Sequence, residues 1–178
     1  MPMWATEGAA IRLTGELDTL EADLDAANRV LFQGLDGPAK AESLGQVLRM
    51  RNKFDALAAS ALSAFEVTQE HRHEGHGSVV AWAKTHGHAK GPEVTRLRRL
   101  AHRVRDMPRV EGALRRGEIT DEHVAVLHRA YRLLGPSSFE VLEEPLVDSA
   151  VDLRFSDFER TVEYVIVRAA PAGADERA

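Results

Sequence analysis

Five arginines lie close together near the middle of the chain, and their chemistry suits contact with phosphate groups. They are Arg96, Arg98, Arg99, Arg103 and Arg105. A guanidinium group is always charged and offers a planar set of donors that matches phosphate oxygens. Helical spacing places Arg96, Arg99 and Arg103 on one face, opposite an apolar face. We therefore predict a nucleic-acid-binding surface. Pairing of the same arginines with acidic helices of this or another chain remains the alternative.

The net charge of −5 conceals a strong asymmetry along the chain. Residues 84–132 carry 12 basic and 6 acidic side chains, a net charge of +6. Residues 1–45 and 133–178 carry net charges of −5 and −6. Binding to nucleic acid depends on the local potential rather than on the average charge. The basic segment is therefore compatible with phosphate contact, and equally with pairing against acidic helices.

A histidine-rich stretch, QEHRHEGHG at residues 69–77, contains the candidate metal ligands His71, His73 and His76. Imidazole is a good ligand for Zn²⁺, Ni²⁺ and Cu²⁺. The spacing is not the H-E-x-x-H pattern, in which two histidines lie one helical turn apart. We therefore favour a pH-sensitive connecting loop without a bound metal, and keep these three histidines as the weaker alternative.

No pattern in the chain indicates catalysis. The phosphate-binding loop G-x-x-x-x-G-K, the nucleophile motif G-x-S-x-G and a pair of carboxylates on one helical face are all missing from the sequence. We predict a protein that is not an enzyme, with no cofactor and no small-molecule substrate.

The arginines must be positioned by helices, because apolar residues recur at helical spacing from residue 14 onward. Two helix–turn–helix units are predicted between Ser78 and Leu134. Ser78 and Thr120 are suitable N-caps, Pro92 and Pro108 suit a first helical turn, and Gly87 and Gly117 suit helix ends.

The flanking segments predict further helices, including a long one over residues 39–70. Its apolar stripe suits a core or a dimer seam, and contains Leu44, Val47, Leu48, Phe54, Leu57, Ala58, Ala61, Leu62 and Phe65. The predicted fold is all-α, an irregular multi-helix bundle with a helix-turn-helix-like centre and no sheet. We expect one helical domain over residues 14–170, a loose lead-in over 1–13 and a disordered tail over 171–178.

Cysteine is absent from the sequence, and no apolar stretch approaches the length of a membrane span. The first residues also lack the basic and apolar regions of a secretory signal. These features favour a cytoplasmic protein with no membrane partner.

The central stretch also resembles a known family. The matching residues are Trp82, the basic helix, Met107-Pro108 and the pattern Ala113-Leu114-x-x-Gly117-x-Ile119-Thr120-x-x-His123-Val124. Over residues 44–153 the chain is similar to an actinobacterial domain of unknown function that commonly precedes an HNH endonuclease domain. The nuclease half is absent from this sequence.

The resemblance and the basic helix together predict a non-catalytic DNA-binding or targeting module. The alternative is a protein–protein or homodimerisation module, with the long helix as its seam and a structural basic helix. Neither the preferred DNA sequence nor the oligomeric state follows from the sequence.

Overall fold

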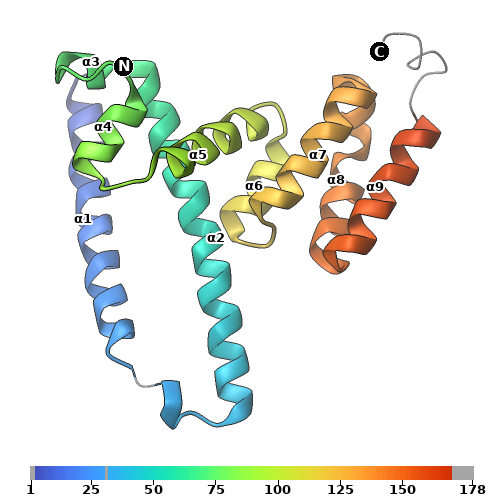
Figure 1. Cartoon of the computed structure of the whole chain (residues 1–178), viewed down its shortest axis with the longest axis horizontal. Helices are drawn as coiled ribbons and strands as arrows, with labels where there is room; N and C mark the ends of the chain where they lie inside the picture. The colour runs from blue at the N-terminus through green and yellow to red at the C-terminus, as the bar shows by residue number, and fades with distance from the viewer. Residues whose placement is uncertain (1–2, 31, 170–178) are drawn as a thin grey trace. The chain divides into compact units, whose positions relative to one another are not determined.

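The chain is helical throughout the residues that can be described. The computed structural model describes residues 3–30 and 32–169, with side chains from residue 12 onward. Within these residues there are nine α-helices, α1 to α9, one short 3-10 helix and no strand (Figure 1). The prediction of an all-α multi-helix fold is confirmed. The predicted single domain is replaced by two compact units, Met1–Leu44 and Gly45–Ala178.

The first unit contains α1 (Met3–Asn28), the 3-10 helix η1 (Phe32–Gly34) and the start of α2 (Gly37–Thr68). Residues 1–13 were predicted as a loose lead-in, but α1 already begins at Met3. Strong helix formers, including Ala5, Ala9 and Ala10, explain the difference. Asp36 caps α2, since its Oδ1 accepts the Ala39 N–H at 2.9 Å. The predicted tail, 171–178, lies outside the described residues.

The second unit contains the rest of α2 and seven further helices. These are α3 (Glu70–His73), α4 (Val79–His86), α5 (Gly91–Val104), α6 (Pro108–Arg116), α7 (Asp121–Leu134), α8 (Pro136–Asp152) and α9 (Phe155–Ala169). Helix α7 lies at the centre of the packing, in contact with α5, α6, α8 and α9. Its Leu127 is fully buried, together with Leu100 of α5, Phe139 of α8 and Phe158 of α9. The two predicted helix–turn–helix units are α4–α5 and α6–α7.

A buried carboxylate stabilises the start of α6. Glu143 of α8 is only 4% exposed. Its Oε1 accepts the N–H groups of Arg109 at 2.9 Å and of Val110 at 3.1 Å. The first N–H groups of a helix lack partners within it, so an acceptor from a neighbouring helix satisfies them. The contact fixes α6 against α8, and the local sequence gave no indication of it.

Helix α2 contributes small residues to the buried core of the second unit, whereas most of the predicted apolar stripe is exposed. Ala56 and Ala59 are buried and belong to the core of this unit. At about 100° per residue, Phe54 and Leu57 lie on the other side of the helix. They are 36% and 42% exposed. From Leu44 to Ala61 the stripe is therefore exposed, whereas Phe65 at its end packs on Trp82 of α4 with a ring-centroid distance of 4.5 Å. The use of the stripe as a dimer seam stays a prediction, because periodicity alone does not tell which of two helix faces a neighbour covers.

The backbone of α2 comes very close to the turn between α6 and α7. Gly117 has a φ of +76°, and a Cβ atom on it would lie 2.5 Å from the Arg49 carbonyl oxygen. The Asn52 side chain also donates a hydrogen bond to the Gly117 carbonyl at 3.2 Å. Only glycine satisfies both the left-handed conformation and the close approach. Gly117 therefore fixes where α2 lies on this unit.

We expect Gly117→Ala to destabilise the protein by more than about 2 kcal/mol, because left-handed strain and a backbone clash act together. Gly75→Ala is the matched control. Gly75 also has a positive φ, +81°, but has open space where a Cβ would lie. It should cost only about 1 kcal/mol. Urea unfolding of both variants measures the difference, and equal losses would contradict the close approach of α2.

Candidate nucleic-acid interface on helix α5

The first of the five predicted arginines, Arg96, is engaged in ion pairs within the second unit. Its guanidinium lies 2.8 Å from Asp55 of α2, 2.7 Å from Glu93 of α5 and 3.3 Å from Asp121 of α7. The hydrogen bonds that Arg96 donates to Glu93 and Asp55 raise the pKa of Arg96 above its usual value. This side chain joins three helices, so its donors are largely occupied by protein carboxylates.

Two further predicted arginines also have acidic partners. Arg103 lies 3.4 Å from Asp121, which it shares with Arg96. Arg98 donates from Nε to Glu66 of α2 at 3.1 Å, and this contact raises the pKa of Arg98. Arg96, Arg98 and Arg103 thus pair with acidic residues of the same chain, which the sequence analysis gave as the alternative to phosphate contact.

Arg99 and Arg105 differ from the other three arginines. Both are exposed. Within the residues that the structure describes, neither has an acidic side chain within ion-pair distance or a side-chain hydrogen bond. Both line a depression of about 390 Å³, called here the α5 groove, whose lining is Ser63, Glu66, Thr95, Arg98, Arg99, Ala101, His102 and Arg105. An anion in this groove would meet two unpaired guanidinium groups.

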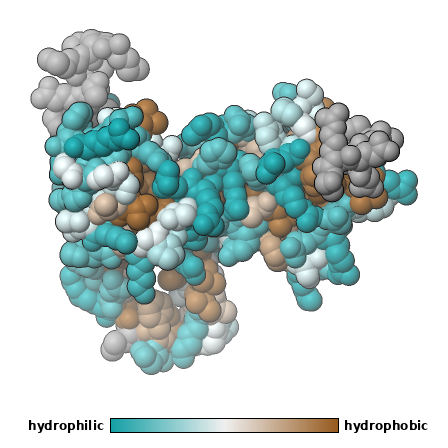
Figure 2. Space-filling view, turned by 45° about the horizontal axis from the view of Figure 1, so that its top comes forward, coloured by the Kyte–Doolittle hydropathy of each residue, from teal (hydrophilic) through white to brown (hydrophobic). Residues whose placement is uncertain are grey.

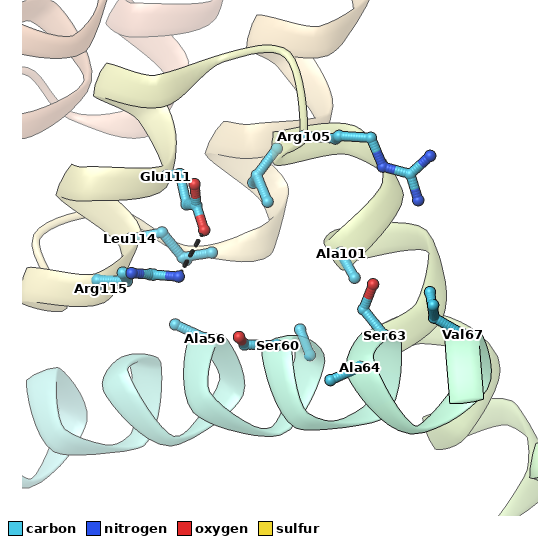
Figure 3. Close-up of a pocket in the computed structure, with 12 residues that line it drawn as sticks. Ala56, Ser60, Ser63, Ala64, Val67, Ala101, Arg105, Glu111, Leu114 and Arg115 are labelled. Carbon is cyan, nitrogen blue, oxygen red and sulfur yellow. Dashed lines mark ion pairs between the residues drawn. The ribbon is translucent and has the colours of Figure 1, made fainter. Parts of the chain in front are cut away.

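Arg105 also lines a neighbouring groove between α2, α5 and α6 (Figure 3). This groove has a volume of about 520 Å³, and α2 contributes only residues of modest size to it, namely Ala56, Ala59, Ser60, Ser63, Ala64 and Val67. On the opposite wall, Arg115 pairs with Glu111 at 2.8 Å. In Figure 3 the guanidinium of Arg105 points away from that pair. The acid in this groove is therefore matched by Arg115, which leaves Arg105 free.

Positive potential extends from α5 to α7. His128 of α7 has a pKa below its usual value, mainly because burial disfavours the charged ring. The positive charges of Arg103, His102 and Arg132 lower it further, and Asp106 acts in the opposite direction. The pKa of His128 therefore responds to positive charges on both α5 and α7. The sequence did not predict this cluster, because its members come from two different helices.

The candidate metal ligands do not form one site. His71 is buried, with 5% exposure, while His73 pairs with Glu70 at 3.3 Å. The Nε2 atoms of His76 and His86 lie 3.3 Å apart. Across residues 3–30 and 32–169, no three histidine or carboxylate groups converge in a way that could hold a metal ion. His71, His73 and His76 thus occupy three different environments.

No protein family, curated protein or solved structure that we compared with this chain matches it. The resemblance to the domain that precedes HNH endonucleases therefore stays a prediction. In the part of the chain that the structure describes, no helix combines the length and apolar character required to cross a membrane.

We expect Arg132→Ala to raise the pKa of His128 toward its ordinary value of about 6.5, without reaching it, because burial remains. NMR titration of the ring protons measures the change, and Arg154→Ala, a remote change of equal charge, should leave the pKa unaltered. A lowered histidine pKa means that the unfolded chain binds more protons than the folded chain. Stability should therefore fall as the pH drops from about 6.5 to the folded pKa. An unchanged His128 pKa in Arg132→Ala would contradict the shared positive potential.

Proposed function

We propose that the chain is a non-catalytic module that binds DNA through the exposed side of α5. The observation that supports this is the separation of the five arginines into two sets. Arg96, Arg98 and Arg103 have protein carboxylates as partners, whereas Arg99 and Arg105 are exposed and have no such partner in the described part of the chain. An unpaired guanidinium on a surface groove is well suited to the phosphate backbone.

The position of α5 in its helix–turn–helix unit agrees with this proposal. Its inner side is held in the protein interior by Val94, Leu100 and Val104, all buried. Helix α4 packs against it from the N-terminal side. A recognition helix needs this arrangement, with one side fixed by the fold and the other side free to meet a groove of the duplex.

Phosphate contacts supply affinity but carry little sequence information. We therefore propose general binding to duplex DNA, with Arg98 and His102 beside the two free arginines. A cytoplasmic location remains part of the proposal, because a chain without cysteine makes no use of an oxidising compartment.

We expect the double variant Arg99→Ala/Arg105→Ala to bind duplex DNA more weakly than the wild type. Its plot of log affinity against log salt concentration should be shallower by about 2, since each phosphate contact contributes about 0.9 to the slope. Fluorescence anisotropy with a labelled duplex at several salt concentrations measures both quantities.

The control is Arg154→Ala/Arg160→Ala, which removes the same formal charge from exposed positions around the start of α9, where Arg160 pairs with Asp157. It should keep the slope of the wild type. A second comparison is the Arg96→Ala/Arg103→Ala variant, in which the arginines that pair with Asp55 and Asp121 are removed. It should lower the midpoint of unfolding clearly and change the salt dependence of DNA binding little. The proposal is wrong if Arg154→Ala/Arg160→Ala reduces the salt slope of DNA binding as much as Arg99→Ala/Arg105→Ala does. It is also wrong if the wild type does not bind DNA at low salt.

A second candidate function, self-association, is favoured by the apolar stripe of α2. Val47, Leu48, Phe54 and Leu57 are 44%, 49%, 36% and 42% exposed, on a helix that meets the second unit through Ala56 and Ala59. Figure 2 shows apolar patches that interrupt the polar surface. Large exposed apolar patches mark interaction sites in many proteins. A chain that does not bind DNA would leave this function as the better candidate.

A further inference from the structure

We infer that a cavity at the N-terminal end of α4 binds a phosphate group. It is distinct from the α5 groove, although Glu66 and Arg98 contribute to both. The cavity, called here the α4 cavity, has a volume of about 250 Å³. Its charged lining residues are Glu66, Arg72 and Arg98.

The first element of the site is the start of α4. Ser78 is the N-cap, and its Oγ accepts the Ala81 N–H at 3.1 Å. The next two residues, Val79 and Val80, line the cavity. In the described part of the chain, their backbone N–H groups have no hydrogen-bond partner. Free N–H groups at a helix start, together with the helix dipole, favour an anion.

The second element is a buried histidine that has an unused polar atom. His71 lines the same cavity with only 5% exposure. Its Nδ1 is buried and has no partner within the described residues. The ring packs against Phe65, with a centroid distance of 6.0 Å. A buried polar atom without a partner is costly unless a ligand or water satisfies it. Because His71 is part of the cavity lining, a phosphate oxygen bound there is the proposed acceptor for an Nδ1–H group.

The third element is the balance of charge. Glu66 is the one carboxylate in the lining, and it pairs with Arg98. Arg72 is exposed and has no acidic partner among the described residues. The lining therefore retains one positive charge when the Glu66–Arg98 pair is intact.

These elements identify the ligand class as a tetrahedral oxyanion, either free phosphate or a terminal phosphate on a nucleotide chain. This proposal can be tested separately from the proposed DNA contact of α5, because the test uses inorganic phosphate and no DNA. Loss of Arg99 and Arg105 would weaken the proposed DNA binding and leave phosphate binding in the α4 cavity in place.

The experiment is a titration of the full chain with inorganic phosphate at constant ionic strength, monitored by ¹H–¹⁵N NMR spectroscopy. We expect saturable shifts of the Val79 and Val80 amides and of the His71 ring nitrogens. Arg72→Ala should weaken binding by about fivefold, as expected for one exposed charge. Arg154→Ala is the matched control and should bind as the wild type does. His71→Phe keeps an aromatic ring beside Phe65 and should also bind more weakly.

A second arm identifies the source of the phosphate. A dinucleotide with a 5′-phosphate should displace inorganic phosphate from the α4 cavity, and the same dinucleotide without that phosphate should not. Shifts at Val79 and Val80 that do not saturate, or that chloride reproduces at the same concentration, would overturn the proposal. Full phosphate affinity in a folded Arg72→Ala/His71→Phe variant would also overturn it.

Discussion

The guanidinium of Arg96 holds together three helices of the second unit. Asp55 of α2, Glu93 of α5 and Asp121 of α7 all lie within 3.3 Å of it. Asp121 is also the partner of Arg103, so two of the α5 arginines share one acid. Since a partly buried arginine that loses its partners carries an uncompensated charge, this network sets the rotation of α5 about its axis. That rotation decides which arginines face the protein and which face solvent.

The ion pair of Glu66 and Arg98 has a related effect on the surface. Both residues line the α4 cavity and the α5 groove, so the pair forms the border between them. By neutralising Glu66, Arg98 removes the acid that would otherwise repel an anion from either side. Among the described residues, Arg72 in the α4 cavity and Arg99 and Arg105 in the α5 groove have no acidic partner, so each depression keeps positive charge of its own.

The helices could be predicted from the sequence, but which face of each helix packs against the protein could not. Ser78, Pro108 and Thr120 identified helix starts because capping and first-turn preferences are local. The two distant partners of Arg96 could not be found in this way, since Asp55 and Asp121 are 41 and 25 residues away in the sequence. Periodicity identified an apolar stripe on α2, but the face that packs on the second unit carries Ala56 and Ala59, and close approach at Gly117 favours small side chains. The contact between Glu143 and α6 likewise depends on tertiary structure alone.

The most direct test of this account is the rate at which each arginine Nε–H proton on α5 exchanges with water, measured by ¹⁵N NMR. The Nε–H groups of Arg96 and Arg98 donate to Glu93 and Glu66, whereas Arg99 and Arg105 have no such bond among the described residues. The account predicts slow exchange for the first two and fast exchange for the second two. It also predicts that added duplex DNA slows exchange at Arg99 and Arg105 while leaving Arg96 unchanged. Equal rates at all four residues, or an effect of DNA at Arg96 alone, would contradict the division of the helix into a structural side and a binding side.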